Sequence, residues 1–372
     1  MRNWFRRRRR EEVDEEGEGQ TAERKRSGWY LRFARQELRG YSPILTAKSV
    51  IIYLLCTSVV LIAFGVPLLT ASTGVVEYYQ RYDNLGAFAP LDESGREALI
   101  RSATDSGFPI DVVFRINKTM EAPVYLYYHL SSFHQNHKRY VRSRGDAQLG
   151  NDGNTTSTCQ PQEYVSHTGE GNPNLQNGGA IDPCGLMPWS FFNDTYRVAV
   201  QAQDGAASQD VTVDDSDIAW TNDRDHLYGS YLPIFWNYNA SERGGTNNSA
   251  SNVDSPVVRI NENQHFMVWM RPAAQPTVRK TWGVINQRLE QGSIVTVTVQ
   301  NRYNTYGFSG PKLVVLSTNS WVGAKDTFLG IAYIVCACIS FVAAVIFFIA
   351  YYLGVATKRK YGDVTHLSWN RR

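Results

Sequence analysis

Two long apolar runs without a charged residue constrain this chain more than any other feature. The first extends from Ser49 to Leu69 and the second from Phe328 to Leu353. Each is at least as long as the ~20 residues with which an α-helix crosses the hydrocarbon core of a bilayer. A buried core helix is the alternative, but such helices are usually shorter, and a cleavable signal core has only ~7–15 apolar residues. We therefore predict transmembrane helices at 49–69 and 328–353.

Lysine and arginine near the ends of these runs predict the orientation of the chain, because such residues stay on the cytosolic side during insertion. Before the first run and after the second lie Arg32, Arg35, Arg39, Lys48, Lys358, Arg359, Lys360, Arg371 and Arg372. The opposite ends carry only Arg81, Lys312 and Lys325. Both termini are therefore predicted to be cytosolic, and residues 70–327 are predicted to be lumenal or extracellular.

The cytosolic parts are predicted to comprise a tail at 1–28, a juxtamembrane segment at 29–48 and a tail at 354–372. The first tail places RRRRR directly before EEVDEEGE, and such charge blocks indicate disorder, although the arginines could also attract anionic lipid. In the juxtamembrane segment Phe33 belongs to an aromatic and basic stretch typical of an interfacial helix. Pro43 follows Ser42 as at a helix start.

The segment 70–327 carries features of an oxidising, glycosylating compartment. All Asn-x-Ser/Thr sequons fall within it, namely Asn117, Asn154, Asn193, Asn239 and Asn247. Of the five cysteines, only Cys159 and Cys184 lie there. An even pair in such a compartment predicts one disulfide, which would stabilise the fold by about 3 kcal/mol.

Apolar residues between the two runs recur with a period near two, which predicts β-strands. The stretches are DVVFRI (111–116), APVYLYYHL (122–130), QHFMVWM (264–270), SIVTVTV (293–299) and KLVVLST (312–318). Polar stretches between them suit exposed loops. Because few apolar helical patterns are available for parallel crossovers, we predict an antiparallel, β-sandwich-like, glycosylated ectodomain flanked by two transmembrane helices.

The stretch YYHLSSFHQNHKRYVRSR (127–144) is dense in histidine, arginine and aromatic residues and invites a chemical interpretation. His134 and His137 could share a metal on a helix, but no Cys, Asp or Glu in the stretch supplies a third ligand. A nucleic-acid interface does not fit the predicted compartment. The tyrosines at its start are predicted to face the core of the ectodomain.

Other signs of catalysis are weak. Asp223 and Asp225 flank Arg224 and are predicted to form a charged loop rather than a pair of catalytic carboxylates. The chain lacks the G-x-S-x-G, H-E-x-x-H, Walker-type and D-K-T-G motifs, and its apolar runs carry no ionisable transport residues. We predict no catalytic site, no metal site and no cofactor.

Seven motifs together resemble the Cdc-fifty/Lem-three family, the accessory β-subunits of type IV P-type ATPases, which are phospholipid flippases. The resemblance covers residues 30 to 372 in the expected order. Its motifs are FARQELRGYSPILT (33–46), the stretch 127–144, PCGLMPWSFFNDTY (183–196), IAWTNDRDHLYG (218–229), FMVWMRPAAQPTVRK (266–280), STNSWVGAKDTFLGIAYI (317–334) and GDVTHLSWNRR (362–372).

The resemblance implies a non-catalytic subunit that forms a heterodimer with the ATPase, escorts it from the endoplasmic reticulum and supports its stability and activity. The partner would move phospholipid from the exoplasmic to the cytosolic leaflet. Residence in the endoplasmic reticulum, Golgi, endosomes or plasma membrane would depend on that partner. Cys184 matches the cysteine of the PCG motif, which supports its pairing with Cys159, and Asn193 matches a position that can carry a glycan.

The arginines of the stretch 127–144 are, with this resemblance, predicted to contact the partner, together with two juxtamembrane residues. These candidates are Arg139, Arg142, Arg144, Phe33 and Pro43. Family members usually have further cysteines upstream of APVYLYYHL, whereas residues 77–121 contain none here. A trimeric two-helix ion channel shares the predicted topology, but its usual ectodomain disulfides and polar pore stripe are not evident.

Overall fold

A computed structural model describes residues 33–36, 46–102, 107–153, 156–165, 176–202, 206–234, 236 and 258–353. The predicted tails at 1–28 and 354–372 lie outside these residues, as do Pro43, Asn154, Asn239 and Asn247. The chain divides into two compact units, Met1–Ile62 with Val335–Arg372 and Ala63–Ile334, and the division falls within both long helices.

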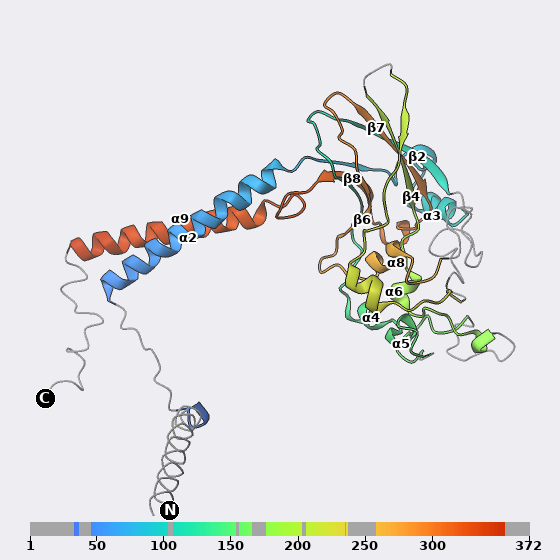
Figure 1. The fold of residues 1–372 in the computed structure, drawn as a ribbon, viewed down its shortest axis with the longest axis horizontal. Coiled ribbons are helices and arrows are strands. Elements are labelled where there is room, and N and C mark those ends of the chain that lie inside the picture. The colour runs from blue at the N-terminus through green and yellow to red at the C-terminus, as the bar shows by residue number, and fades with distance from the viewer. Residues whose placement is uncertain are drawn as a thin grey trace, which may run out of the picture. The chain divides into compact units, whose positions relative to one another are not determined.

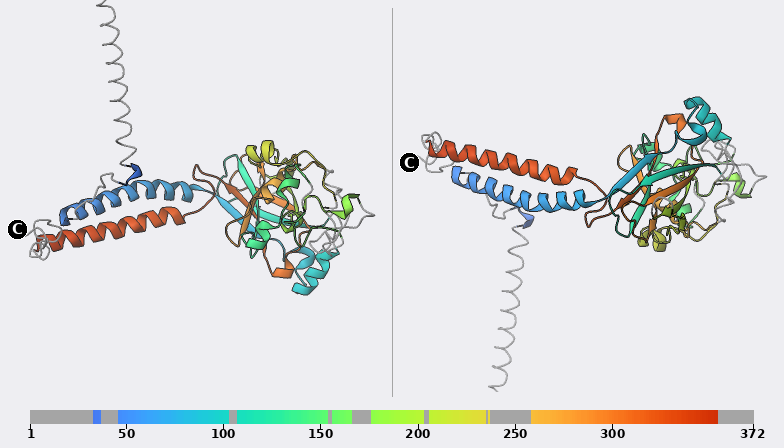
Figure 2. Two further views of the ribbon diagram at one scale, coloured as in Figure 1. Left: turned by 90° about the horizontal axis from the view of Figure 1, so that it is seen from below. Right: turned by 90° about the horizontal axis from the view of Figure 1, so that it is seen from above.

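Both apolar runs form helices that are long and apolar enough to cross a membrane. Helix α2 (Ala47–Gly74) extends beyond the predicted run at both ends, and helix α9 is Phe328–Tyr352. Within each unit their segments lie side by side (Figure 2). In the second unit the backbones approach closely, because a Cβ added to Gly330 would lie 2.8 Å from the Leu69 backbone nitrogen.

The first sheet of the β-rich domain has the order β1-β8-β3-β6, and all its pairs are antiparallel. Its strands are β1 (Glu77–Arg81), β8 (Lys312–Thr318), β3 (Val124–Leu130) and β6 (Val278–Ile285). Strand β1 follows α2 in the sequence, and its neighbour β8 precedes α9 (Figure 1). Both chain connections to the apolar helices therefore leave from adjacent strands.

The second sheet has the order β2-β7-β4-β5 and is also antiparallel. Its strands are β2 (Phe108–Arg115), β7 (Ile294–Asn301), β4 (Thr195–Gln201) and β5 (Gln209–Val211). In β7 the buried residues Val295, Val297 and Val299 alternate with half-buried ones, as period two requires. They join residues of the other sheet, including Leu126 and Leu316, in one hydrophobic core.

Four of the five predicted strands are present, but the prediction of a strand at 264–270 is wrong. That segment is the short helix α8 (Gln264–Trp269). The Asn263 side chain accepts a hydrogen bond from the Phe266 backbone nitrogen at 2.9 Å and so caps the first turn. At the other end Lys280 Nζ donates to the Val268 carbonyl at 2.7 Å. Capping at both ends therefore favours a helix.

Short helices occupy the connections between the strands (Figure 1). The α-helices are α3 (Glu93–Arg101), α4 (Lys138–Arg142), α5 (Asp146–Leu149) and α6 (Leu186–Trp189). The other helical turns are η1 (Gly86–Phe88), η2 (Gln176–Gly179), η3 (Asp223–Leu227) and η4 (Tyr306–Phe308). Helices α4, α5 and α6 gather at one end of the β-rich domain, where they build the surface considered next.

Candidate docking surface

The stretch 127–144 begins inside the domain and ends at its surface. Tyr128 of β3 is in the core and stacks on Phe192 with ring centroids 4.1 Å apart. Tyr127 points to the other face of the sheet, where the Arg279 guanidinium lies 4.5 Å from its ring centre. The prediction that both tyrosines face the core therefore holds for Tyr128 alone, because successive strand residues alternate between faces.

A turn after β3 anchors this stretch before it reaches α4. The buried Gln135 side chain accepts a hydrogen bond from the Ala273 backbone nitrogen at 2.9 Å. Asn136 donates to the Ala274 carbonyl at 2.8 Å. His134 and His137 are exposed, and His137 is the residue before the first turn of α4. The two histidines thus lie on a turn and not on one face of a helix.

Helix α4 presents two arginines to solvent. Its inner face is held by Tyr140, whose hydroxyl lies 2.8 Å from Ser190 Oγ, and burial raises the Tyr140 pKa above its usual value. Arg139 and Arg142 are exposed and form no ion pair with any residue that the structure describes. An exposed guanidinium group that is unpaired within its own chain can bind a carboxylate of a partner through two parallel hydrogen bonds.

Arg144 differs from its two neighbours because it is already paired. Its Nε lies 2.7 Å from Asp146 Oδ1, and Asp146 is largely exposed. Both residues line a surface hollow of about 460 Å³, together with Val141, Arg142, Gly145, Ala147 and Thr158. Surface ion pairs contribute only about 0–1 kcal/mol, so a partner could rearrange this one at little cost.

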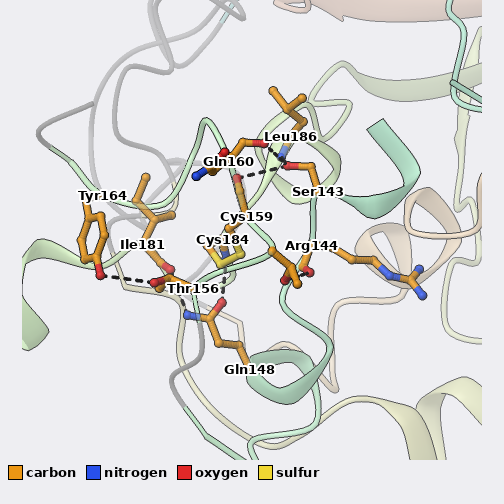
Figure 3. The surroundings of a disulfide bond; sticks show 11 residues. Ser143, Arg144, Gln148, Thr156, Cys159, Gln160, Tyr164, Ile181, Cys184 and Leu186 are labelled. Atoms are coloured by element: carbon orange, nitrogen blue, oxygen red, sulfur yellow. Dashed lines mark hydrogen bonds between the residues drawn. A yellow bond between two sulfur atoms is a disulfide. The ribbon is translucent and has the colours of Figure 1, made fainter. Parts of the chain in front are cut away.

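A disulfide fixes the backbone beneath these arginines. Cys159 and Cys184 form the expected pair, with Cα atoms 5.5 Å apart, and both are fully buried. Figure 3 shows Ser143 and Gln148 on either side of it. Ser143 Oγ accepts from the Leu186 backbone nitrogen at 2.9 Å, and Gln148 Oε1 accepts from the Cys184 backbone nitrogen at 3.0 Å.

Gly185 is required for this close packing. Its φ of +112° is unfavourable for other residues, and an added Cβ would lie 2.2 Å from the Ser143 carbonyl oxygen. Arg144 follows Ser143 directly, and its side chain points away from the disulfide (Figure 3). The disulfide, Ser143 and Gly185 therefore determine where the arginine-bearing segment lies.

Three other predicted site residues have defined surroundings. Asn117 is exposed, and its backbone nitrogen donates to the Tyr78 hydroxyl at 2.8 Å. Asn193 is half-buried and lies two residues before the start of β4. Phe33 lies in the short helical turn at 33–36 and is 57% exposed. Glycosylation and partner contact at these residues stay predictions.

The sequence interpretation missed a buried ion pair near the sequon at Asn193. Lys312 Nζ of β8 lies 2.9 Å from Asp194 Oδ2, and both side chains are 0% exposed. Asp194 also accepts from the backbone nitrogens of Arg302 and Tyr303 at 2.6 and 2.7 Å. Burial lowers the Lys312 pKa, and the Asp194 carboxylate opposes that shift. This pair joins the two sheets.

The predicted charged loop around Arg224 is instead the helical turn η3. Asp225 pairs with Arg224 at 3.1 Å, but Asp223 is buried and binds Arg271 through two hydrogen bonds of 2.6 and 2.8 Å. The Arg271 guanidinium lies 3.5 Å from the ring centre of Trp220, which is 65% exposed. The carboxylate of Asp223 therefore holds the Arg271 guanidinium against the face of Trp220.

Two long apolar helices that flank an antiparallel β-rich domain define a candidate two-span membrane protein. The model of the LEM3 (ligand-effect modulator 3) family / CDC50 family matches residues 68–358, which include the whole β-rich domain and α9. The chain therefore belongs to the LEM3/CDC50 family, as its motifs predicted.

Curated relatives from three kingdoms resemble the chain over most of its length. ALA-interacting subunit 3 of Arabidopsis thaliana is 38% identical over 344 residues, which cover 92% of this chain and 90% of the relative. Cell cycle control protein 50A of Mus musculus is 30% identical, with coverages of 84% and 86%. Phospholipid-transporting ATPase accessory subunit CRF1 of Saccharomyces cerevisiae is 28% identical, with coverages of 89% and 86%.

Proposed function

We propose that this chain is a non-catalytic accessory subunit of a type IV P-type ATPase that transports phospholipid. The family match over 68–358 carries the proposal, because it covers the β-rich domain together with α9. A yeast relative that aligns over 89% of this chain is named as a phospholipid-transporting ATPase accessory subunit. ATP hydrolysis and lipid movement from the exoplasmic to the cytosolic leaflet belong to the partner in this proposal.

In the proposed topology α2 and α9 span the bilayer, both termini are cytosolic and the β-rich domain is lumenal or extracellular. The excess of lysine and arginine outside the two helices supports this orientation. The buried disulfide Cys159–Cys184 also fits an oxidising compartment. The exposed side chain of Asn117 makes it the best placed described sequon for a glycan.

The chain forms a heterodimer with the ATPase and accompanies it from the endoplasmic reticulum to the membrane in which the partner works. The subunit contributes to the stability and activity of the ATPase. We assign part of the contact to Arg139 and Arg142, because both are exposed and without an ion pair in the described part of the chain. Arg144 contributes through the adjacent hollow, and Phe33 and Pro43 add juxtamembrane contact.

Affinity purification of the tagged chain in mild detergent, followed by mass spectrometry, tests the proposed assembly. A heavier P-type ATPase should co-purify, and ATP hydrolysis should require that chain. Purified material that hydrolyses ATP without a bound P-type ATPase would refute the accessory role.

Charge reversal tests the docking surface separately. The variant Arg139→Glu with Arg142→Glu should recover less ATPase than the native chain, because carboxylates would repel the acidic groups that guanidinium groups attract. Arg197→Glu is the matched control, since Arg197 is an exposed arginine on β4 outside this surface. Equal recovery with both variants would exclude the α4 surface while leaving the accessory role intact.

A further inference from the structure

A tight turn between β8 and α9 presents two large apolar side chains to solvent. Ser320 and Gly323 exchange two backbone hydrogen bonds of 2.9 Å, and Trp321 and Val322 form the tip between them. Trp321 is 76% exposed and Val322 is 39% exposed. Tips of tight turns usually carry Gly, Asn, Asp or Pro, so an apolar pair there has no local conformational reason.

Polar contacts hold this turn, residues 320–323, in a fixed conformation. Ser320 Oγ accepts from the Val322 backbone nitrogen at 3.3 Å, and the Ser320 hydroxyl donates to the Gly323 carbonyl at 3.3 Å. On the preceding side Asn319 Nδ2 donates to the Tyr127 hydroxyl of β3 at 2.9 Å. These hydrogen bonds hold Trp321 at the exposed tip of the turn and attach the turn to the first sheet.

The turn is also connected to the ends of both apolar helices, within the unit Ala63–Ile334. The Asp326 backbone nitrogen donates to Ser72 Oγ of α2 at 3.0 Å. Asp326 Oδ1 accepts from the Phe328 backbone nitrogen at 2.9 Å and caps the first turn of α9. In Figure 1 the loop from β8 to α9 lies beside the C-terminal end of α2.

We propose that Trp321 and Val322 insert into the interfacial region of the exoplasmic leaflet and fix the height of the β-rich domain above the bilayer. Even fully extended, residues 323–327 span only ~16–18 Å, so the tip cannot lie far from the start of α9. The indole combines an apolar ring with an N–H donor and therefore favours the headgroup level.

Lipid fits this tip better than a protein groove does. Phe328, the first residue of α9, is 75% exposed and adds a further large apolar side chain at the start of the helix, beyond the exposed Lys325 and Asp326. Two apolar side chains at the end of a rigid turn offer little polar surface for specific recognition. The proposal rests on the membrane-spanning topology under Proposed function, but not on the identity of the partner.

Site-directed labelling of the full chain in nanodiscs tests the insertion. Cysteines outside the disulfide are first replaced by alanine, at Cys56, Cys336 and Cys338. An environment-sensitive maleimide fluorophore is then attached to Trp321→Cys, in discs of phosphatidylcholine with or without brominated acyl chains. Brominated lipid should remove most of the emission, and aqueous iodide should remove little. Increasing the salt concentration should not reverse this, because the contact is apolar.

Two control labels separate the possible outcomes. Trp220→Cys labels another exposed tryptophan, which lies beside Arg271 and should respond to iodide alone. Phe341→Cys labels the middle of α9 and should be quenched by brominated lipid if the helix spans the bilayer. Quenching at Phe341 without quenching at Trp321 overturns the insertion alone. Absence of quenching at both positions overturns the membrane-spanning topology of the proposed function as well.

The native chain provides a second measurement that needs no substitution. Hydroxyl-radical footprinting in phosphatidylcholine nanodiscs should oxidise Trp220 much more than Trp321, although both are exposed on the protein. Equal oxidation of the two tryptophans would contradict the proposal. Protection of Trp321 that arises only when the ATPase is bound would also contradict it, because a protein would then be the occupant of this site.

Discussion

The buried pair of Lys312 and Asp194 allows a quantitative prediction about what holds the two sheets together. In the variant Lys312→Met the apolar part of the side chain stays, but the ammonium group is lost. The Asp194 carboxylate then loses the ammonium group that lies 2.9 Å from its Oδ2. The Tyr303 carbonyl loses a donor at 2.6 Å, and Asn301 Oδ1 loses its hydrogen bond from the same ammonium.

Removal of one member of a buried ion pair costs about 3–5 kcal/mol, because the remaining charge is desolvated without compensation. In a domain of ~150–250 residues each kcal/mol lowers the melting temperature by about 2–4 °C, so a decrease of about 6–20 °C is expected. Adding Asp194→Asn should recover part of this loss, since the carboxamide carries no charge and keeps an acceptor for the Arg302 and Tyr303 backbone nitrogens.

Thermal unfolding of the purified full chain in detergent measures these effects. Lys118→Met is the matched control, because Lys118 is exposed and the same side-chain atoms are changed. Its melting temperature should equal that of the native chain. The reasoning fails if Lys312→Met unfolds at the same temperature as Lys118→Met, or if the double variant is no more stable than Lys312→Met.

Three further substitutions test other parts of the structure, by the same melting assay and, for the disulfide, also by export from the endoplasmic reticulum. Burial raises the pKa of Asp182 to about 6, above its ordinary unfolded value of about 3.9. The folded state therefore favours the protonated carboxyl group, and the stability that this group contributes is lost as the pH rises through 6. Asp182→Asn should raise the melting temperature at pH ~7.5 but not at pH ~4. Gly330→Val should destabilise the helix pair by about 1–3 kcal/mol, whereas Gly74→Val, where nothing lies within 4 Å, should not. Cys159→Ser should cost about 3 kcal/mol and cause retention in the endoplasmic reticulum without the ATPase; normal export would contradict this.

Apolar periodicity predicted four of the eight strands in the described residues, β2, β3, β7 and β8, but not β1, β4, β5 or β6. In β7 every second residue is buried, and the predicted strand at 293–299 coincides closely with Ile294–Asn301. The uncharged runs likewise predicted α2 and α9, because length and composition alone decide whether a helix can cross a bilayer. Strand β1 has only half-buried or exposed residues and therefore gave no such signal.

The segment 264–270 shows where periodicity fails. A short apolar run is compatible with either a helix or a strand, and its capping residues decide between them. Asn263 is adjacent and could have been recognised as an N-cap. Lys280 lies on β6, and its contact with the last turn of α8 depends on the tertiary fold. The N-terminal cap of α8 could therefore be predicted from the neighbouring sequence, whereas the contact at its C-terminal end could not.

The buried charge of Lys312 and the exposed charges of α4 differ in how far the sequence could have indicated their surroundings. Lys312 shares its side of β8 with the buried Val314 and Leu316, and a lysine on an apolar face requires a buried partner. That partner, Asp194, is 118 residues away, so the sequence could indicate its existence but not its identity. Arg139 and Arg142, in contrast to Lys312, carry their charges at the surface. They are exposed on α4, no described residue pairs with them, and the disulfide fixes the backbone next to them. The segment is ordered before any partner binds, so the acidic partner that we propose would not have to order its backbone on binding.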